Sequence, residues 1–144
     1  MLPFTQLRNR HFLEAAKKII DSLPKDSVID ITSVAIKAAS SPAPHYYCTF
    51  IYALRMIYVY RHSKQPMKEG RRKQLWRELN QRVDDHIAEH GGTVTDALQK
   101  VLSAGNASQF FLSPVTAANL VRRYYDYKTR TILLPDSLAF IPHF

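Results

Sequence analysis

The sequence predicts an all-α fold in which two related three-helix units pack as one compact helical domain. The chain has only four glycines among 144 residues, and residues that favour helices dominate it. Hydrophobic residues make up 46% of the chain and aromatic residues 11%, which is enough for a packed core. Similar stretches recur at a nearly constant spacing in the two halves, which indicates an internal duplication. We expect the first unit in residues 1–64, the second in residues 65–130 and a packing tail in residues 131–144.

The first unit is expected to begin with two helices separated by a proline. Thr5 is the candidate N-cap of the first helix, and Pro24 ends it because the residue before a proline avoids the α-helical region. The second helix is predicted to open at Ser27, with Asp30 at its third position in an approximate capping box. It ends at the proline-containing stretch 40–44.

A third helix is predicted over residues 50–62, after the N-cap Thr49. Its apolar and aromatic residues occupy several faces, which predicts that much of the helix is buried. Phe50, Tyr52 and Tyr58 could stack on nucleic-acid bases. A core position is the favoured interpretation of all three side chains.

A basic linker, residues 63–70, spans the boundary between the two expected units. The longest helix of the second unit is predicted over residues 71–90, where an apolar residue recurs at every fourth position before the glycine pair at 91–92. Thr93 is expected to cap the next helix, which ends before Gly105.

The last predicted helix has the best-formed start in the chain. Residues 107–111 are expected to form a single helical turn that leads into a tight connection. Ser113 is the N-cap, and Pro114 occupies the first position of a helix that runs to about Lys128. The apolar tail, residues 131–144, is expected to pack in extended form across the core.

The duplication is inferred from caps, aromatic pairs and helix faces taken together. The aromatic stretch Tyr46-Tyr47-Cys48-Thr49 matches Phe110-Phe111-Leu112-Ser113. On the helices that follow, Ala53, Met56, Ile57 and Tyr60 match Ala117, Leu120, Val121 and Tyr124 at the same spacing. The cap Ser27-Val28-x-Asp30 matches Thr93-Val94-x-Asp96 at a slightly longer spacing, which requires compensating changes in loop length.

Residues 107–128, a short turn followed by a capped helix, resemble the helix-turn-helix of DNA-binding proteins. In that motif the second helix lies in the major groove, and residues near its N-terminus contact base edges. The resemblance implies that Thr116 and Asn119 lie nearest the bases, where asparagine can pair with adenine, and that Arg122 and Arg123 reach phosphates or guanine. The turn lacks the usual glycine. The alternative is that the apolar residues here are core and the arginines a solvated face.

The charge distribution favours a polyanionic partner. Twenty Lys and Arg against twelve Asp and Glu give a net charge of +8, which suits nucleic acid or an anionic surface. Residues 61–77 carry +6, and residues 78–96 carry −4. The basic stretch fits phosphate contacts, and a solubilising linker is an equal alternative. The predicted nucleic-acid-binding residues are Ser113, Thr116, Asn119, Arg122, Arg123, Lys128, Lys64, Lys68, Arg71, Arg72, Lys73 and Arg77.

Three short patterns could suggest catalysis, and each has a structural explanation. His86-Ile-Ala-Glu89-His90 matches an inverted zinc-protease motif, but such enzymes need a third ligand and a larger domain. Asp84 and Asp85 point about 100° apart on a helix and are expected to face solvent. Cys48 is close to His45, but its place between aromatic residues suits packing. We expect no catalysis, no metal, no cofactor and no small-molecule substrate.

The leading functional prediction is therefore a non-enzymatic DNA-binding protein, with regulation as one role. The alternative is a protein-interaction or assembly module, of phage or mobile-element origin, that contacts a protein partner or a second copy. The single cysteine fits a reducing compartment, and no apolar run approaches the length of a membrane span. The N-terminal residues lack the order of a signal peptide, so we expect a cytoplasmic location.

Overall fold

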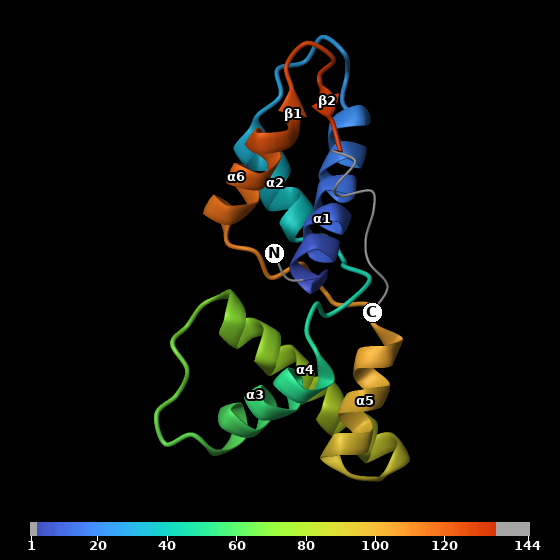
Figure 1. Cartoon of the computed structure of the whole chain (residues 1–144), viewed down its shortest axis with the longest axis vertical. Helices are drawn as coiled ribbons and strands as arrows, with labels where there is room; N and C mark the ends of the chain where they lie inside the picture. The colour runs from blue at the N-terminus through green and yellow to red at the C-terminus, as the bar shows by residue number, and fades with distance from the viewer. Residues whose placement is uncertain (1–2, 135–144) are drawn as a thin grey trace. The chain divides into compact units, whose positions relative to one another are not determined.

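The computed structural model describes residues 3–134, which form six helices and a small two-stranded sheet (Figure 1). The chain is therefore mostly helical, as predicted. The elements are α1 (Pro3–Asp21), α2 (Ile31–Ala39), α3 (Phe50–His62), α4 (Arg71–His90), α5 (Val94–Ala104), α6 (Pro114–Tyr124), β1 (Tyr125–Asp126) and β2 (Thr131–Ile132).

The chain forms two compact units. Unit 1 combines the N-terminal segment up to Tyr47 with the segment from Ala107 onward, and unit 2 covers Cys48–Asn106. Unit 1 thus holds α1, α2, α6 and both strands, whereas unit 2 holds α3, α4 and α5. The helices are grouped differently from the expected division into residues 1–64 and 65–130, because α3 packs with α4 and α5 and α6 packs with α1 and α2.

Helix α2 is central to unit 1, because it packs against both α1 and α6. Its buried residues Val34, Ala35 and Ala38 have small side chains, which allow the neighbouring helices to approach closely. The rings of Phe12 and Phe110 meet edge to face with centroids 5.8 Å apart, and both are nearly fully buried. Burial of each ring contributes about 1.5–3 kcal/mol to the hydrophobic stabilisation of unit 1.

The predicted start of α2 at Ser27 is wrong. Asp30 is the N-cap, and its carboxylate accepts hydrogen bonds from the backbone N–H and the hydroxyl of Ser33, at 3.3 and 2.9 Å. These hydrogen bonds lower the pKa of Asp30. The Ser27 hydroxyl instead donates to the carbonyl of Pro24 within the preceding loop. The capping-box assignment was wrong because both Ser27 and Asp30 have side chains that can cap a helix. The geometry of the loop places Asp30, and not Ser27, at the start of α2.

A short hairpin follows α6, which ends at Tyr124 and not near Lys128. Asp126 accepts hydrogen bonds from the residues of the turn, Lys128 and Thr129, and so stops the helix from continuing. Strands β1 and β2 pair antiparallel, Ile132 is buried, and β2 packs on α1. The expected extended tail is confirmed only at residues 131–132, since residues 135–144 lie outside the described part of the chain.

Unit 2 is built around α4, whose buried residues are Trp76, Leu79 and Val83. Side-chain contacts join α3 and α4 at two places. At the starts, Arg72 Nη2 donates to the Tyr52 hydroxyl at 2.5 Å. Further along, the Arg61 guanidinium contacts Asn80 and Asp84 at 2.6 and 2.5 Å.

The prediction that much of α3 is buried is wrong. Ala53 and Ile57 are its buried residues, and they lie one helical turn apart on the face that packs against α4 and α5. Ile51 and Tyr58 are 64% and 66% exposed. A helix with apolar residues on several faces buries only the faces that other elements cover, and here α4 and α5 cover one face of α3.

Candidate nucleic-acid interface

Helix α6 has the start that the sequence predicts. The backbone N–H of Thr116 donates to the Ser113 hydroxyl at 3.2 Å, and Pro114 occupies the first helical position. Ala117, Ala118 and Val121 are buried against the rest of unit 1. These small buried residues place the opposite face of α6 at the surface.

The outward face of α6 carries the four predicted reading residues, Thr116, Asn119, Arg122 and Arg123, and all four are exposed. The helix contains no acidic residue. Arg123 lies over the ring of Tyr124, with its guanidinium carbon 5.5 Å from the ring centroid. The side chain of Asn119 makes no hydrogen bond within the described residues. The face therefore combines an amide, a hydroxyl and two guanidinium groups.

Arg122 also has a structural contact. Its Nη2 atom donates to the hydroxyl of Thr32 at 3.1 Å, which joins the exposed face of α6 to that of α2. Arg122 adds a small electrostatic contribution to the lowered pKa of Asp30, whose main cause is the hydrogen bonding of Ser33. Arg122 is thus partly committed to holding α2 and α6 together, unlike Asn119.

The helical turn expected at residues 107–111 is wrong. Ala107 instead forms an isolated antiparallel bridge with Ala43, and Phe111 adopts a positive φ of 55°. The segment is irregular, with bends at residues 108 and 109, and the Phe110 N–H donates to the carbonyl of Ala39 at 2.9 Å. Consequently α6 has no short helix immediately before it, and its packing partner is α2, which lies far earlier in the chain.

The basic residues around the start of α4 differ in how strongly they are paired. Glu69 contacts Lys73 Nζ at 2.8 Å and Arg77 Nη2 at 3.3 Å, and the hydrogen bond from Lys73 is the main cause of its lowered pKa. Arg72 donates to the Tyr52 hydroxyl, as described above. The Arg71 Nη1 atom donates to Gln74 at 3.2 Å.

Lys64 and Lys68 lie in the exposed linker, and their side chains make no hydrogen bond or ion pair within residues 3–134. Of the predicted residues, Ser113, Thr116, Asn119, Arg122, Arg123 and Lys128 belong to unit 1, and Lys64, Lys68, Arg71, Arg72, Lys73 and Arg77 belong to unit 2. The candidate residues thus form two sets, one in each unit.

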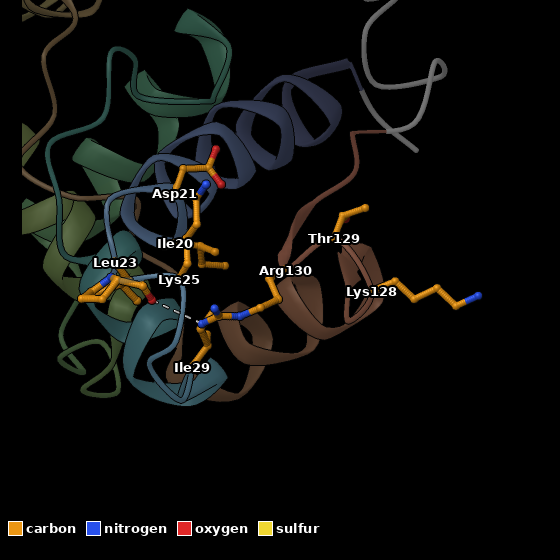
Figure 2. Close-up of a pocket in the computed structure, with 9 residues that line it drawn as sticks. Ile20, Asp21, Leu23, Lys25, Ile29, Lys128, Thr129 and Arg130 are labelled. Carbon is orange, nitrogen blue, oxygen red and sulfur yellow. Dashed lines mark hydrogen bonds between the residues drawn. The ribbon is translucent and has the colours of Figure 1, made fainter.

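Unit 1 also contains an open recess of about 470 Å³ beside the hairpin turn (Figure 2). Arg130 crosses it and donates to the carbonyls of Ser27 and Pro24, the latter at 3.5 Å. Lys128 points away from this contact in Figure 2. The Arg130 guanidinium therefore bonds to the backbone of the α1–α2 loop. These hydrogen bonds join that loop to the hairpin across the recess. Sequence reasoning missed Arg130, because only the fold brings residues so far apart into contact.

A second cluster that sequence reasoning missed involves α1. His11 Nδ1 and the Tyr47 hydroxyl share a hydrogen bond of 2.6 Å, and the rings of His11 and His45 stack with centroids 5.6 Å apart. Burial is the main cause of the lowered pKa of His11, and the neighbouring His45 lowers it further. Burial also raises the pKa of the Tyr47 hydroxyl. The cluster therefore favours neutral imidazole at His11 near neutral pH.

The residues considered for catalysis have other contacts. The rings of His86 and His90 lie 4.6 Å apart, but the described residues include no group of three or more side chains able to hold a metal ion. Asp84 contacts Arg61, and Asp85 accepts a hydrogen bond from Gln81. Burial raises the pKa of the Cys48 thiol to about 11, so this thiol stays protonated at neutral pH.

Within residues 3–134, no helix has the length and apolar character needed to cross a membrane. In comparisons with known proteins, no protein-family model, curated protein or solved structure matches the chain.

Proposed function

We propose that this protein binds nucleic acid, with DNA as the first choice, and that α6 is the helix that contacts the bases. The observation that carries the proposal is the outward face of α6, where Thr116, Asn119 and Arg123 are exposed together and no acidic residue occurs. Asparagine can form two hydrogen bonds with adenine, and arginine can do so with guanine. The proposed role is non-catalytic and cytoplasmic and needs no cofactor.

In this proposal α2 supports α6 in the way that the first helix supports the reading helix of a helix-turn-helix. The contact between Arg122 and Thr32 fixes the two helices relative to each other. The supporting helix comes from a distant part of the sequence, so the arrangement is helix-turn-helix-like in its function and not in its connectivity. Asn119 and Arg123 then discriminate bases, while Arg122 mainly positions α6.

The linker and the start of α4 supply phosphate contacts in the same proposal. Lys64 and Lys68 are exposed, and Arg72 is held near the start of α3 by its contact with Tyr52. Lys73 and Arg77 share Glu69, which reduces the net charge that they offer to a phosphate. We therefore expect Lys64, Lys68 and Arg72 to contribute most to salt-dependent affinity.

The test is fluorescence anisotropy of a labelled duplex over a salt series. Asn119→Ala with Arg123→Ala should weaken binding by about tenfold or more, since a good pair of base contacts contributes about 1–3 kcal/mol. Lys18→Ala is the matched control, because Lys18 is an exposed cation on α1 of the same unit. The proposal is wrong if the wild-type protein leaves the duplex unbound at low salt, or if the double variant binds as the control does.

A protein-interaction module is the second candidate, and one observation favours it. Ile51, Tyr58 and Val59 are 64%, 66% and 38% exposed on α3, which leaves an apolar surface on a folded unit. Sedimentation velocity of the wild type and of Ile51→Ser with Tyr58→Ser tests self-association through this surface. A concentration-dependent dimer that the double variant abolishes supports the module, and identical monomeric profiles reject self-association.

We also propose that the chain arose by duplication of a three-helix unit. Buried residues support this in α2 and α5, where Val34, Ala35 and Ala38 correspond to Ala97, Leu98 and Val101 at one constant spacing. The N-caps follow the same spacing, because Asp30 caps α2 and Thr93 caps α5. This pairing replaces the sequence-based match of Ser27 with Thr93.

A further inference from the structure

We infer that the two copies have exchanged their third helices, so that α6 completes the first copy and α3 completes the second. The first copy would consist of α1, α2 and α3, yet α1 and α2 pack with α6. The second copy would consist of α4, α5 and α6, yet α4 and α5 pack with α3. The inference rests on the proposed duplication and is independent of nucleic-acid binding.

Helices α3 and α6 share the same kind of N-cap and the same buried positions. Each begins at a hydroxyl N-cap, Thr49 and Ser113, which accepts a hydrogen bond from the backbone N–H three residues later at 3.1 and 3.2 Å. Ala53 and its counterpart in α6, Ala117, are both fully buried. Ile57 and Val121 are 1% and 0% exposed and lie at the same spacing as the two N-caps. The N-caps and the buried residues therefore give the same alignment of α3 with α6.

The segments that lead into the third helices cross at equivalent positions. Ala43 and Ala107, which have the same spacing as the N-caps, form an antiparallel bridge in which the Ala43 N–H donates to the Ala107 carbonyl at 3.0 Å. Both residues are 2% exposed. A residue pairs with its own counterpart when two antiparallel segments are related by a local twofold. Such a crossing is what carries each third helix away from its own copy.

The outward faces of the two third helices have diverged. Ile51 and Val115 are equivalent and remain apolar at 64% and 70% exposure. Tyr58 stands where α6 has Arg122, and Val59 stands where α6 has Arg123. Equivalent faces of the two third helices are therefore both exposed, and the face is polar and basic on α6 but aromatic on α3.

A cut in the linker tests the exchange in the full-length protein. A protease site inserted between Gln65 and Pro66, in an exposed stretch, allows the folded chain to be cleaved between the two copies. With exchanged helices, the two fragments should elute together in a 1:1 complex, and the cut should make the melting temperature depend on concentration. The uncut insertion variant is the control. Separation into two independently folded fragments would overturn the inference.

A helix replacement tests the equivalence of α3 and α6. Residues 50–60 are replaced by the sequence of residues 114–124, which puts alanine and valine at the buried positions 53 and 57. A second variant uses residues 115–125, which puts arginine at position 57. The first variant should keep a single cooperative unfolding transition at a lower melting temperature, and the second should lose it. If both variants behave alike, the register that pairs Thr49 with Ser113 is wrong. Neither readout involves nucleic acid, so failed binding to a duplex leaves this test intact.

Discussion

Arg130 offers a quantitative test of how the hairpin is joined to unit 1. Its guanidinium donates to the backbone carbonyls of Ser27 and Pro24, and its own backbone adopts a positive φ of 53°. A hydrogen bond from a charged group contributes about 1.5–3 kcal/mol, and partial exposure favours the lower end. A left-handed conformation costs a residue other than glycine about 1 kcal/mol. The side chain and the backbone of Arg130 thus have opposite effects on the free energy of unfolding.

Two substitutions separate these effects. Arg130→Ala loses the hydrogen bonds and keeps the backbone cost, so it should lower the free energy of unfolding by about 1.5 kcal/mol. Arg130→Gly loses the same bonds but removes the backbone cost, so it should lower it by only about 0.5 kcal/mol. Equilibrium urea unfolding followed by far-ultraviolet circular dichroism measures both values. Lys128→Ala is the control, and it should change the free energy by less than about 0.5 kcal/mol.

Equal destabilisation by alanine and glycine would refute the left-handed backbone at Arg130. No destabilisation by alanine would show that the contacts with the α1–α2 loop contribute nothing to stability.

Three further predictions concern titration, reactivity and packing. Because the folded-state pKa of His11 is lowered, the contribution of this residue to stability should be fully present above a pH of about 6.5 and should fall as the pH drops further. The melting temperature measured over a pH series is the readout. His11→Gln is the control, and it should flatten the profile. Cys48, whose pKa is raised to about 11, should react with iodoacetamide at pH 8 far more slowly in the folded protein than in urea; equal rates would contradict its burial. Ile57→Ala should cost about 2–5 kcal/mol and Ile51→Ala less than about 0.5 kcal/mol in urea unfolding, and similar costs would contradict the assigned face of α3.

Local signals in the sequence predicted the helices well where a cap and a breaker lie close together. Ser113 with Pro114 marks the start of α6, and Thr93 marks the start of α5, because a side chain and a backbone N–H three residues later can meet without help from the rest of the fold. The predicted start of α2 was wrong because the local signal was ambiguous. Two polar residues, Ser27 and Asp30, could each cap it, and only the course of the preceding loop decides between them.

The sequence could predict which residues of the candidate site are exposed, but not which distant residues they contact. The pattern of α6 identified Thr116, Asn119 and Arg123 as outward-facing, since a helix with one small apolar stripe must expose the remainder. Nothing local could show that Arg122 reaches Thr32, which lies in a different helix far earlier in the chain. The same limit hid Arg130, whose partners lie earlier still, in the loop before α2.

Local patterns in the sequence were enough to predict that this protein is mostly helical, where most of its helices begin, and which residues recur at a nearly constant spacing. These properties depend on backbone hydrogen bonds and on side chains within a few residues of each other. The packing of α6 with α1 and α2, and of α3 with α4 and α5, became visible only in the fold, and this packing sets which faces of α3 and α6 remain exposed. Under the proposed duplication the two copies offer the same buried pattern, so either pair of helices can bury either third helix. In the exchange inferred above, the bridge between Ala43 and Ala107 marks where the two connecting segments cross.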